Sequence, residues 1–148
     1  MDDRTEMLLA KPNDTLFTHG GCHVFALALR DFTHLPLIWI HEDGGSWDHL
    51  ACDAGSGFIV DFFGWFSHSQ YLHEEMIEDR TIRFDAISEE QVTRRFVFGP
   101  GQGYYARPDF VVPAMQRARI WIAAHRDYFD GTKKVVIPGL SRLKSQTT

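Results

Sequence analysis

Three residues whose side chains can act together in nucleophilic chemistry occur in the first half of the chain: Cys22, His49 and Asp61. Cys22 follows Gly20-Gly21 and begins an apolar, Ala- and Leu-rich run that is typical of a helix. A thiol on the first turn of a helix lies near exposed backbone N–H groups and the positive end of the helix dipole, which stabilise a thiolate. An imidazole held by a carboxylate can accept the proton of such a thiol. The sequence therefore predicts a catalytic triad of nucleophile, base and orienting carboxylate.

The segment between His49 and Asp61 predicts a β-hairpin that would bring these two residues together. Its middle, residues 53–57, is rich in turn-forming residues, and both flanks are apolar. If the turn is centred on Gly55, His49 lies directly opposite Asp61, with Cβ atoms about 4.5–5.5 Å apart. At that separation the imidazole and the carboxylate can form a hydrogen bond. A slip of one residue would place them on opposite faces, so the prediction depends on the register.

A second interpretation uses the same region to bind zinc. His19-x-x-Cys22 and His49-x-x-Cys52 have the spacing of two metal-ligand pairs and would give a site of two histidines and two cysteines. If residues 47–52 form a strand, however, His49 and Cys52 point to opposite faces. The two pairs are also farther apart in sequence than in compact zinc ribbons. We therefore expect no metal and no cofactor, and we keep the zinc site as the alternative.

The composition narrows the class of protein. The chain has 148 residues, 44% of them hydrophobic and 14% aromatic, which is enough for one folded domain over residues 1–148 with its own core. The tail, about 140–148, is expected to fray. A net charge of −5 without a basic run argues against a nucleic-acid partner. No apolar stretch reaches membrane-spanning length, so no membrane partner is expected either.

The N-terminus and the cysteine count indicate the compartment. Residues 1–6 are acidic and lack the basic-then-apolar order of a secretion signal. Two cysteines in a chain without such a signal are expected to remain thiols. We therefore expect a cytoplasmic protein, although export by a specialised secretion system would leave no trace of this kind.

Hydrophobic periodicity and turn residues predict the order of the elements. The expected helices are 1–12, 22–33, a short one after Ser67 to about Met76, one from the capping box at Ser88 to about Phe96, and 109–129 ending near Gly131. The expected strands are 37–40, the two hairpin strands, the second of which ends at 64–67, and 81–85, with a turn at 13–15 and a loop at 99–103. This order predicts an α+β fold in which the Cys22 helix packs on a small antiparallel sheet carrying His49 and Asp61.

The order and surroundings of the three residues resemble the papain-like cysteine hydrolase superfamily. The resemblance rests on Gly21-Cys22, the strand of His49, and Asp61-x-x-Gly64, within residues 18–65 or about a third of the chain. The order Cys–His–Asp is similar to the transglutaminase-like and arylamine N-acetyltransferase branches, and to compact bacterial amidases and cysteine-protease effectors. It implies a papain-like core and an amide substrate, such as a peptide, an isopeptide or a glutamine side chain, cleaved through a thioester.

The resemblance also implies an oxyanion hole beside the cysteine. In papain-like enzymes a side chain upstream of the cysteine, often Gln, helps to form it, but no Gln precedes Cys22 here. The candidates are His19, Thr18 and a backbone N–H of the turn around Gly21. Trp47 and Trp65 flank the two hairpin strands and are the candidates for lining a substrate cleft.

Taken together, the residues and the resemblance predict a cysteine hydrolase or acyltransferase that acts on an amide bond of a protein or peptide substrate. Its small size and acidic charge suit a toxin, a phage product or a host-targeted effector. The alternative from a different class is a protein-interaction domain without catalysis, either zinc-stapled or metal-free, in which the hairpin is only a scaffold. The sequence leaves the oligomeric state open.

Overall fold

One antiparallel sheet organises the part of the chain that the computed structural model describes, which is residues 3–18, 20–44, 48–94 and 107–140. Its five strands are β1 (Leu37–Glu42), β2 (Asp48–Gly55), β3 (Phe58–Asp61), β4 (Gly64–Ser67) and β5 (Ile82–Ala86). They lie in the order β4-β3-β2-β1-β5, so β2 is the central strand. Helices and an antiparallel sheet together confirm the expected α+β class.

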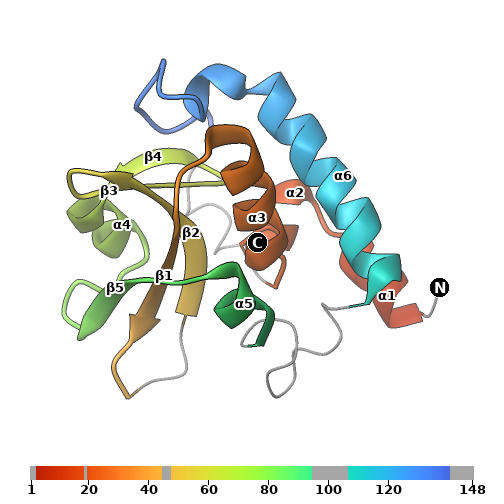
Figure 1. Cartoon of the computed structure of the whole chain (residues 1–148), viewed down its shortest axis with the longest axis horizontal. Coiled ribbons are helices and arrows are strands. Elements are labelled where there is room, and N and C mark those ends of the chain that lie inside the picture. The colour runs from red at the N-terminus through yellow and green to blue at the C-terminus, as the bar shows by residue number, and fades with distance from the viewer. Residues whose placement is uncertain (1–2, 19, 45–47, 95–106, 141–148) are drawn as a thin grey trace.

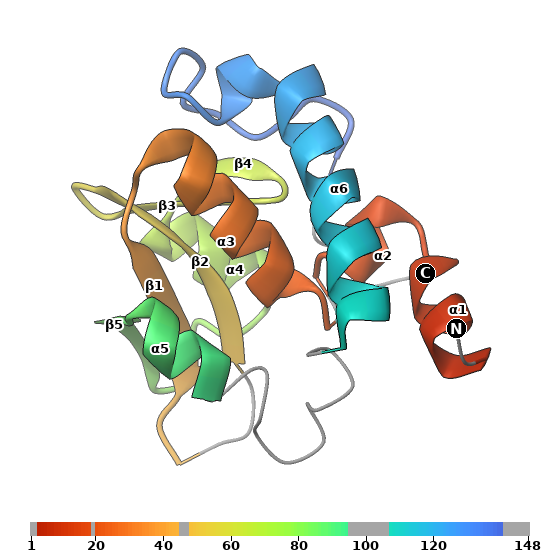
Figure 2. The same cartoon turned by 45° about the vertical axis from the view of Figure 1, so that its right-hand side comes forward.

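The helices flank this sheet (Figure 1). They are α1 (Asp3–Leu9), α2 (Asn13–Leu16), α3 (Cys22–Thr33), α4 (His68–Glu74), α5 (Glu89–Val92) and α6 (Pro108–Ala124), followed by the 3-10 helix η3 (Arg126–Tyr128). α3 packs on β2 and is in turn covered by α6, an arrangement that is clearest in Figure 2. None of the helices within the described ranges is long and apolar enough to cross a membrane.

α3 has the bounds that the sequence predicts. Val24, Phe25 and Leu29 recur at helical spacing and are buried. The helix ends at His34, which adopts a left-handed conformation with φ of 61° and donates its N–H to the carbonyl of Arg30 at 2.7 Å. Pro36 follows shortly afterwards and cannot continue a helix. Cys22 is therefore the first residue of a helix whose apolar face is anchored in the core.

The hairpin is present, but its turn lies further along the chain than the sequence suggests. The two central residues are Ser56 and Gly57, with φ of 54° and 80°. Positive φ at both central positions is typical of the tightest hairpin turns, because their twist matches that of the strands. Gly55 ends β2 and faces Phe58, so it precedes the turn instead of forming its centre.

A β-bulge follows immediately on β2. Gly55 faces Phe58, whereas Asp53 faces Ile59, so β2 advances by two residues while β3 advances by one. Ala54 is thus the extra residue of the bulge. This insertion changes which residues of the two strands share a face.

Two further segments differ from expectation at the start of the chain and after the hairpin. Residues 13–15, expected as a turn, belong to the one-turn helix α2. The Arg117 guanidinium of α6 holds that corner by donating to the Asn13 side chain and to the carbonyls of Leu9 and Lys11. Residues 64–67, expected to end the second hairpin strand, form the separate strand β4, because the chain reverses at Phe62-Phe63.

The ends of the later helices also differ. α6 ends at Ala124, and a 3-10 turn carries the chain on to Tyr128, so Gly131 does not cap the helix. The Ser67 cap of α4 and the Ser88 capping box of α5 are present as expected. α5 ends at Val92, and the predicted loop at 99–103 and most of the tail lie outside the described residues.

Candidate active site

Cys22 is placed by a tight turn between α2 and α3. The Gly21 N–H donates to the Leu16 carbonyl at 2.8 Å, and a Cβ on Gly21 would lie only 2.5 Å from that oxygen. Gly20 has φ of 111°, a conformation that side chains rarely adopt. Both glycines therefore have a structural reason, which the sequence alone did not reveal. The Gly-Gly pair therefore gives no separate support to a catalytic role for Cys22.

His49 and Asp61 form a buried hydrogen bond. His49 Nε2 lies 2.9 Å from Asp61 Oδ2, and the Phe63 backbone N–H donates to the other carboxylate oxygen at 3.0 Å. The exposed fractions are 9% for Cys22, 6% for His49 and 3% for Asp61. Both oxygens of the Asp61 carboxylate are thus hydrogen-bonded, which holds the carboxylate in place beside the imidazole.

The predicted contact between His49 and Asp61 exists, but the predicted register is wrong. Cys52 faces Val60, and the same register continued by one residue puts Asp61 opposite Ala51. His49 and Asp61 are therefore diagonal neighbours, a relation in which Cα atoms lie about 7–8 Å apart and longer side chains still meet. The difference from the predicted pairing is two residues, and an even difference keeps both side chains on one face.

The bulge at Ala54 keeps the side chains of His49 and Asp61 on the same face of the sheet. The turn pairs Gly55 with Phe58, and without the extra residue this register would continue to place Asp61 opposite Cys52. His49 lies three residues before Cys52 on the same strand, so it would then face the other side of the sheet. A single inserted residue thus decides whether the imidazole and the carboxylate can meet.

His49 also interacts with the Cys22 side chain. Burial by itself lowers the pKa of His49, but hydrogen bonds with Asp61 and Cys22 and their negative charges outweigh it and raise that pKa to about 10. The imidazole is then protonated at neutral pH and donates in two directions. Because Nε2 is engaged by Asp61, Nδ1 is the nitrogen left for the sulfur of Cys22. Such a pair can hold a thiolate ready for attack on a carbonyl carbon.

Cys52 has a different environment from Cys22. Its Sγ donates to the Ala26 carbonyl at 3.5 Å on the face covered by α3, and burial raises its pKa to about 12. His49 and Cys52 alternate along β2 and point to opposite faces, as the argument against zinc requires. Within the described residues no group of three His, Cys, Asp or Glu side chains could hold a metal ion, and His19 lies outside them.

The candidate oxyanion donors are only partly available. The Thr18 hydroxyl donates to the carbonyl of Asp14, and the Gly21 N–H is engaged by Leu16. His19 lies outside the described residues. The N-cap residue Gly21 has no side chain to cap the first turn of α3. Among the described donors, the Cys22 backbone N–H is therefore the candidate nearest to an oxyanion formed at the thiol.

Of the two candidate tryptophans, only Trp65 lies within the described residues, and its side chain points away from Asp61. Trp47 lies outside the described residues. Trp65 faces Val60 across β3 and β4, whereas Asp61 faces Gly64, so Trp65 and Asp61 point to opposite faces. The Lys134 ammonium lies 5.4 Å from the Trp65 ring, and this contact belongs to the C-terminal segment that covers β4.

The structure adds one aromatic contact that the sequence did not indicate. The Tyr71 ring, fully buried in α4, lies 5.7 Å from the His49 ring with an interplanar angle of 18°. Ser67 predicts the start of α4 through its cap, but no local pattern shows which of its residues would contact β2. That contact depends on how α4 folds back over the sheet.

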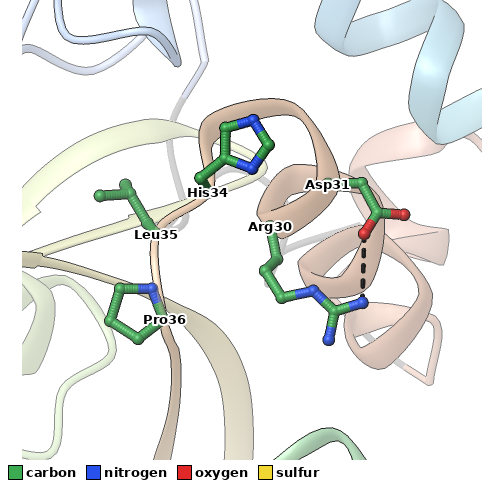
Figure 3. A pocket seen from close by; sticks show the side chains of 5 residues that line it. All are labelled: Arg30, Asp31, His34, Leu35 and Pro36. Carbon is green, nitrogen blue, oxygen red and sulfur yellow. Dashed lines mark hydrogen bonds and ion pairs between the residues drawn. The ribbon is translucent and has the colours of Figure 1, made fainter.

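A surface pocket of about 380 Å³ lies at the other end of α3 (Figure 3). It is lined by Arg30, Asp31, His34, Leu35 and Pro36. Arg30 forms ion pairs with Asp31 and Glu89, so its charge is already compensated. Eight residues of helix separate Arg30 from Cys22, which is about 12 Å along the axis. This pocket is therefore separate from the buried site.

No known protein family, curated protein or solved structure matches this chain. The functional argument consequently depends on the geometry of its own residues.

Proposed function

We propose that the chain is a cysteine hydrolase or acyltransferase that cleaves an amide bond through a thioester on Cys22. The observation that supports this most directly is the His49–Asp61 hydrogen bond of 2.9 Å on the same imidazole that interacts with the thiol. Three residue types that can form a nucleophile, a base and an orienting group are thus connected in that order. The papain-like resemblance leads to the same chemistry.

The reaction would proceed in two balanced steps. The Cys22 thiolate attacks the carbonyl carbon, and the developing oxyanion accepts hydrogen bonds from the Cys22 N–H and a second donor. The C–N bond then breaks as the His49 imidazolium gives its proton to the leaving amine, which leaves a thioester. Water, or an acceptor amine in a transferase, attacks the thioester while His49 takes its proton. The C–S bond breaks, the acyl product leaves, and the Cys22 thiolate and His49 imidazolium are restored, with Asp61 orienting His49 throughout.

One observation favours the non-catalytic alternative. All three side chains are almost fully buried, and Gly20-Gly21 is explained by the turn that it forms. A buried His–Asp pair can also serve only to join two strands of a scaffold. In that case Cys22 would be an unreactive core thiol.

Alkylation with iodoacetamide, followed by mass spectrometry of the labelled peptides, distinguishes a catalytic Cys22 from an unreactive core thiol. In a catalytic site Cys22 is labelled rapidly at pH 6, because the neighbouring His49 imidazolium favours the reactive thiolate. Cys52 is the internal control, since its burial and raised pKa keep it unreactive in the folded protein. The His49→Gln variant should slow labelling of Cys22 at pH 6 at least about tenfold.

Acyl transfer provides the second test. An activated ester such as p-nitrophenyl acetate should leave one acetyl group on Cys22, detected by intact mass, in the wild type but not in Cys22→Ala. A chelator should change neither result, whereas a zinc site would release Cys22 for labelling only after chelation. Equal labelling of Cys22 in wild type and His49→Gln, without an acyl adduct, would reject the proposal in favour of the scaffold.

A further inference from the structure

We propose that Tyr71 is a positioning residue that holds the His49 imidazole in the plane from which it faces Cys22. This inference rests on the proposed thiol chemistry, and it requires no contact between Tyr71 and a substrate. It assigns a role to α4, an element that contributes none of the three reacting residues.

The sheet brings Tyr71 and His49 together through one row of residues. Ile40 on β1 pairs with His49 of β2 on one side and with Phe84 of β5 on the other. Paired residues share a face, so these three side chains point to the same side of the sheet. The rings of His68 and Tyr71 contact Phe84 and His49, which places α4 over that face. α3 packs against the other face, where Cys52 meets Ala26.

The hydrogen bond to Asp61 does not by itself fix the imidazole plane. It holds Nε2 at 2.9 Å from Oδ2, but the ring can still turn about the line through that bond. Turning would move Nδ1 away from the sulfur of Cys22. The Tyr71 ring lies 5.7 Å away at 18°, within the range of offset stacking, and so restricts this rotation on one side.

Tyr71 is itself held in place. Its side chain is completely buried, and the Phe84 ring lies 6.5 Å away at 76° in an edge arrangement. Phe84 is stacked on His68 at 3.9 Å with an interplanar angle of 2°. The imidazole is therefore supported by an aromatic wall of three rings, from Tyr71 through Phe84 to His68. Each ring of this wall contacts the next, which limits the movement of Tyr71 against His49.

The test uses variants that separate the ring from the hydroxyl. Tyr71→Phe keeps the flat ring and should retain rapid alkylation of Cys22 at pH 6. Tyr71→Leu removes the ring and should slow alkylation at pH 6 at least about tenfold, with little change near pH 9.5, where an ordinary thiol is also ionised. Phe110→Leu is the matched control, because it truncates another fully buried ring, on α6, and should leave the pH profile unchanged.

Two further measurements keep the outcome decisive. The ¹⁵N chemical shifts of His49 should report a changed protonation state in Tyr71→Leu and not in Tyr71→Phe. If Tyr71→Leu does not fold, Phe84→Leu removes the backing of Tyr71 and should shift the profile in the same direction. If the pH profile of alkylation is unchanged in whichever of Tyr71→Leu and Phe84→Leu folds, while His49→Gln still slows labelling, the role of Tyr71 alone is overturned. If His49→Gln has no effect either, the proposed thiol chemistry fails as well.

Discussion

Replacing Asp61 by Asn is the sharpest perturbation of the proposed site. The substitution keeps the shape of the side chain but removes its charge and presents an amide to the imidazole. The pKa of His49, about 10, lies well above its ordinary value of 6.5. Since one pKa unit corresponds to about 1.4 kcal/mol, the surroundings as a whole, with the opposing effect of burial included, favour the imidazolium by on the order of 5 kcal/mol. Without Asp61, burial counteracts the remaining interaction with Cys22 and the pKa of His49 should fall markedly.

Loss of the proton from the His49 imidazolium should lower the reactivity of Cys22. An imidazole that loses its proton more easily gives less support to a thiolate on Cys22. Alkylation of Cys22 at pH 6 should therefore slow by about tenfold or more in Asp61→Asn, and turnover of any acyl substrate should fall by up to about four orders of magnitude through the wrong tautomer. The assay is alkylation rate against pH, together with histidine NMR titration of the same samples.

The chain offers a matched control. His41 Nε2 lies 2.7 Å from Asp85 Oδ2, so a second His–Asp pair joins β1 and β5 of the same sheet. Asp85→Asn removes the charge from a comparable His–Asp pair at a partly exposed position and should leave Cys22 labelling unchanged. If Asp61→Asn folds, keeps the pKa of His49 near 10 and labels at the wild-type rate, Asp61 does not control the imidazole and the triad argument is refuted.

Two other predictions concern stability. The pKa of His49 is raised above 6.5 in the folded state, so its contribution to the free energy of unfolding is complete below pH 6.5 and is lost as the pH rises through about 10. Urea unfolding should therefore show a larger fall in the free energy of unfolding between pH 7 and 10 in the wild type than in His49→Gln. Parallel curves for the two proteins would contradict this. Gly21→Ala places a Cβ 2.5 Å from the Leu16 carbonyl oxygen and should cost roughly 1–3 kcal/mol of unfolding free energy by overpacking; an unchanged denaturation midpoint would show that the turn yields.

Local signals in the sequence predicted the elements that depend on local physics. The apolar spacing of α3 and the stop after it gave the helix Cys22–Thr33. Ser67 and Ser88 predicted the starts of α4 and α5, because a capping hydroxyl satisfies backbone N–H groups within its own turn. The predicted end of α6 was wrong. The helix ends where contacts of the 3-10 turn and the segment beyond it require, and no local sequence pattern shows those contacts.

The register of β2 and β3 shows where sequence reasoning stops. Residues 53–57 can form a turn centred on Gly55 or on Ser56-Gly57, and the second choice adds a bulge at Ala54. Turn propensity does not distinguish these two choices. Burial does, because a register changed by an odd number of residues would move every side chain of one strand to the other face of the sheet. The predicted contact of His49 with Asp61 is therefore present although the predicted register is wrong, because an error of two residues leaves both side chains on the same face. A turn shifted without its bulge would have placed Asp61 on the face of Cys52, where no imidazole lies opposite it.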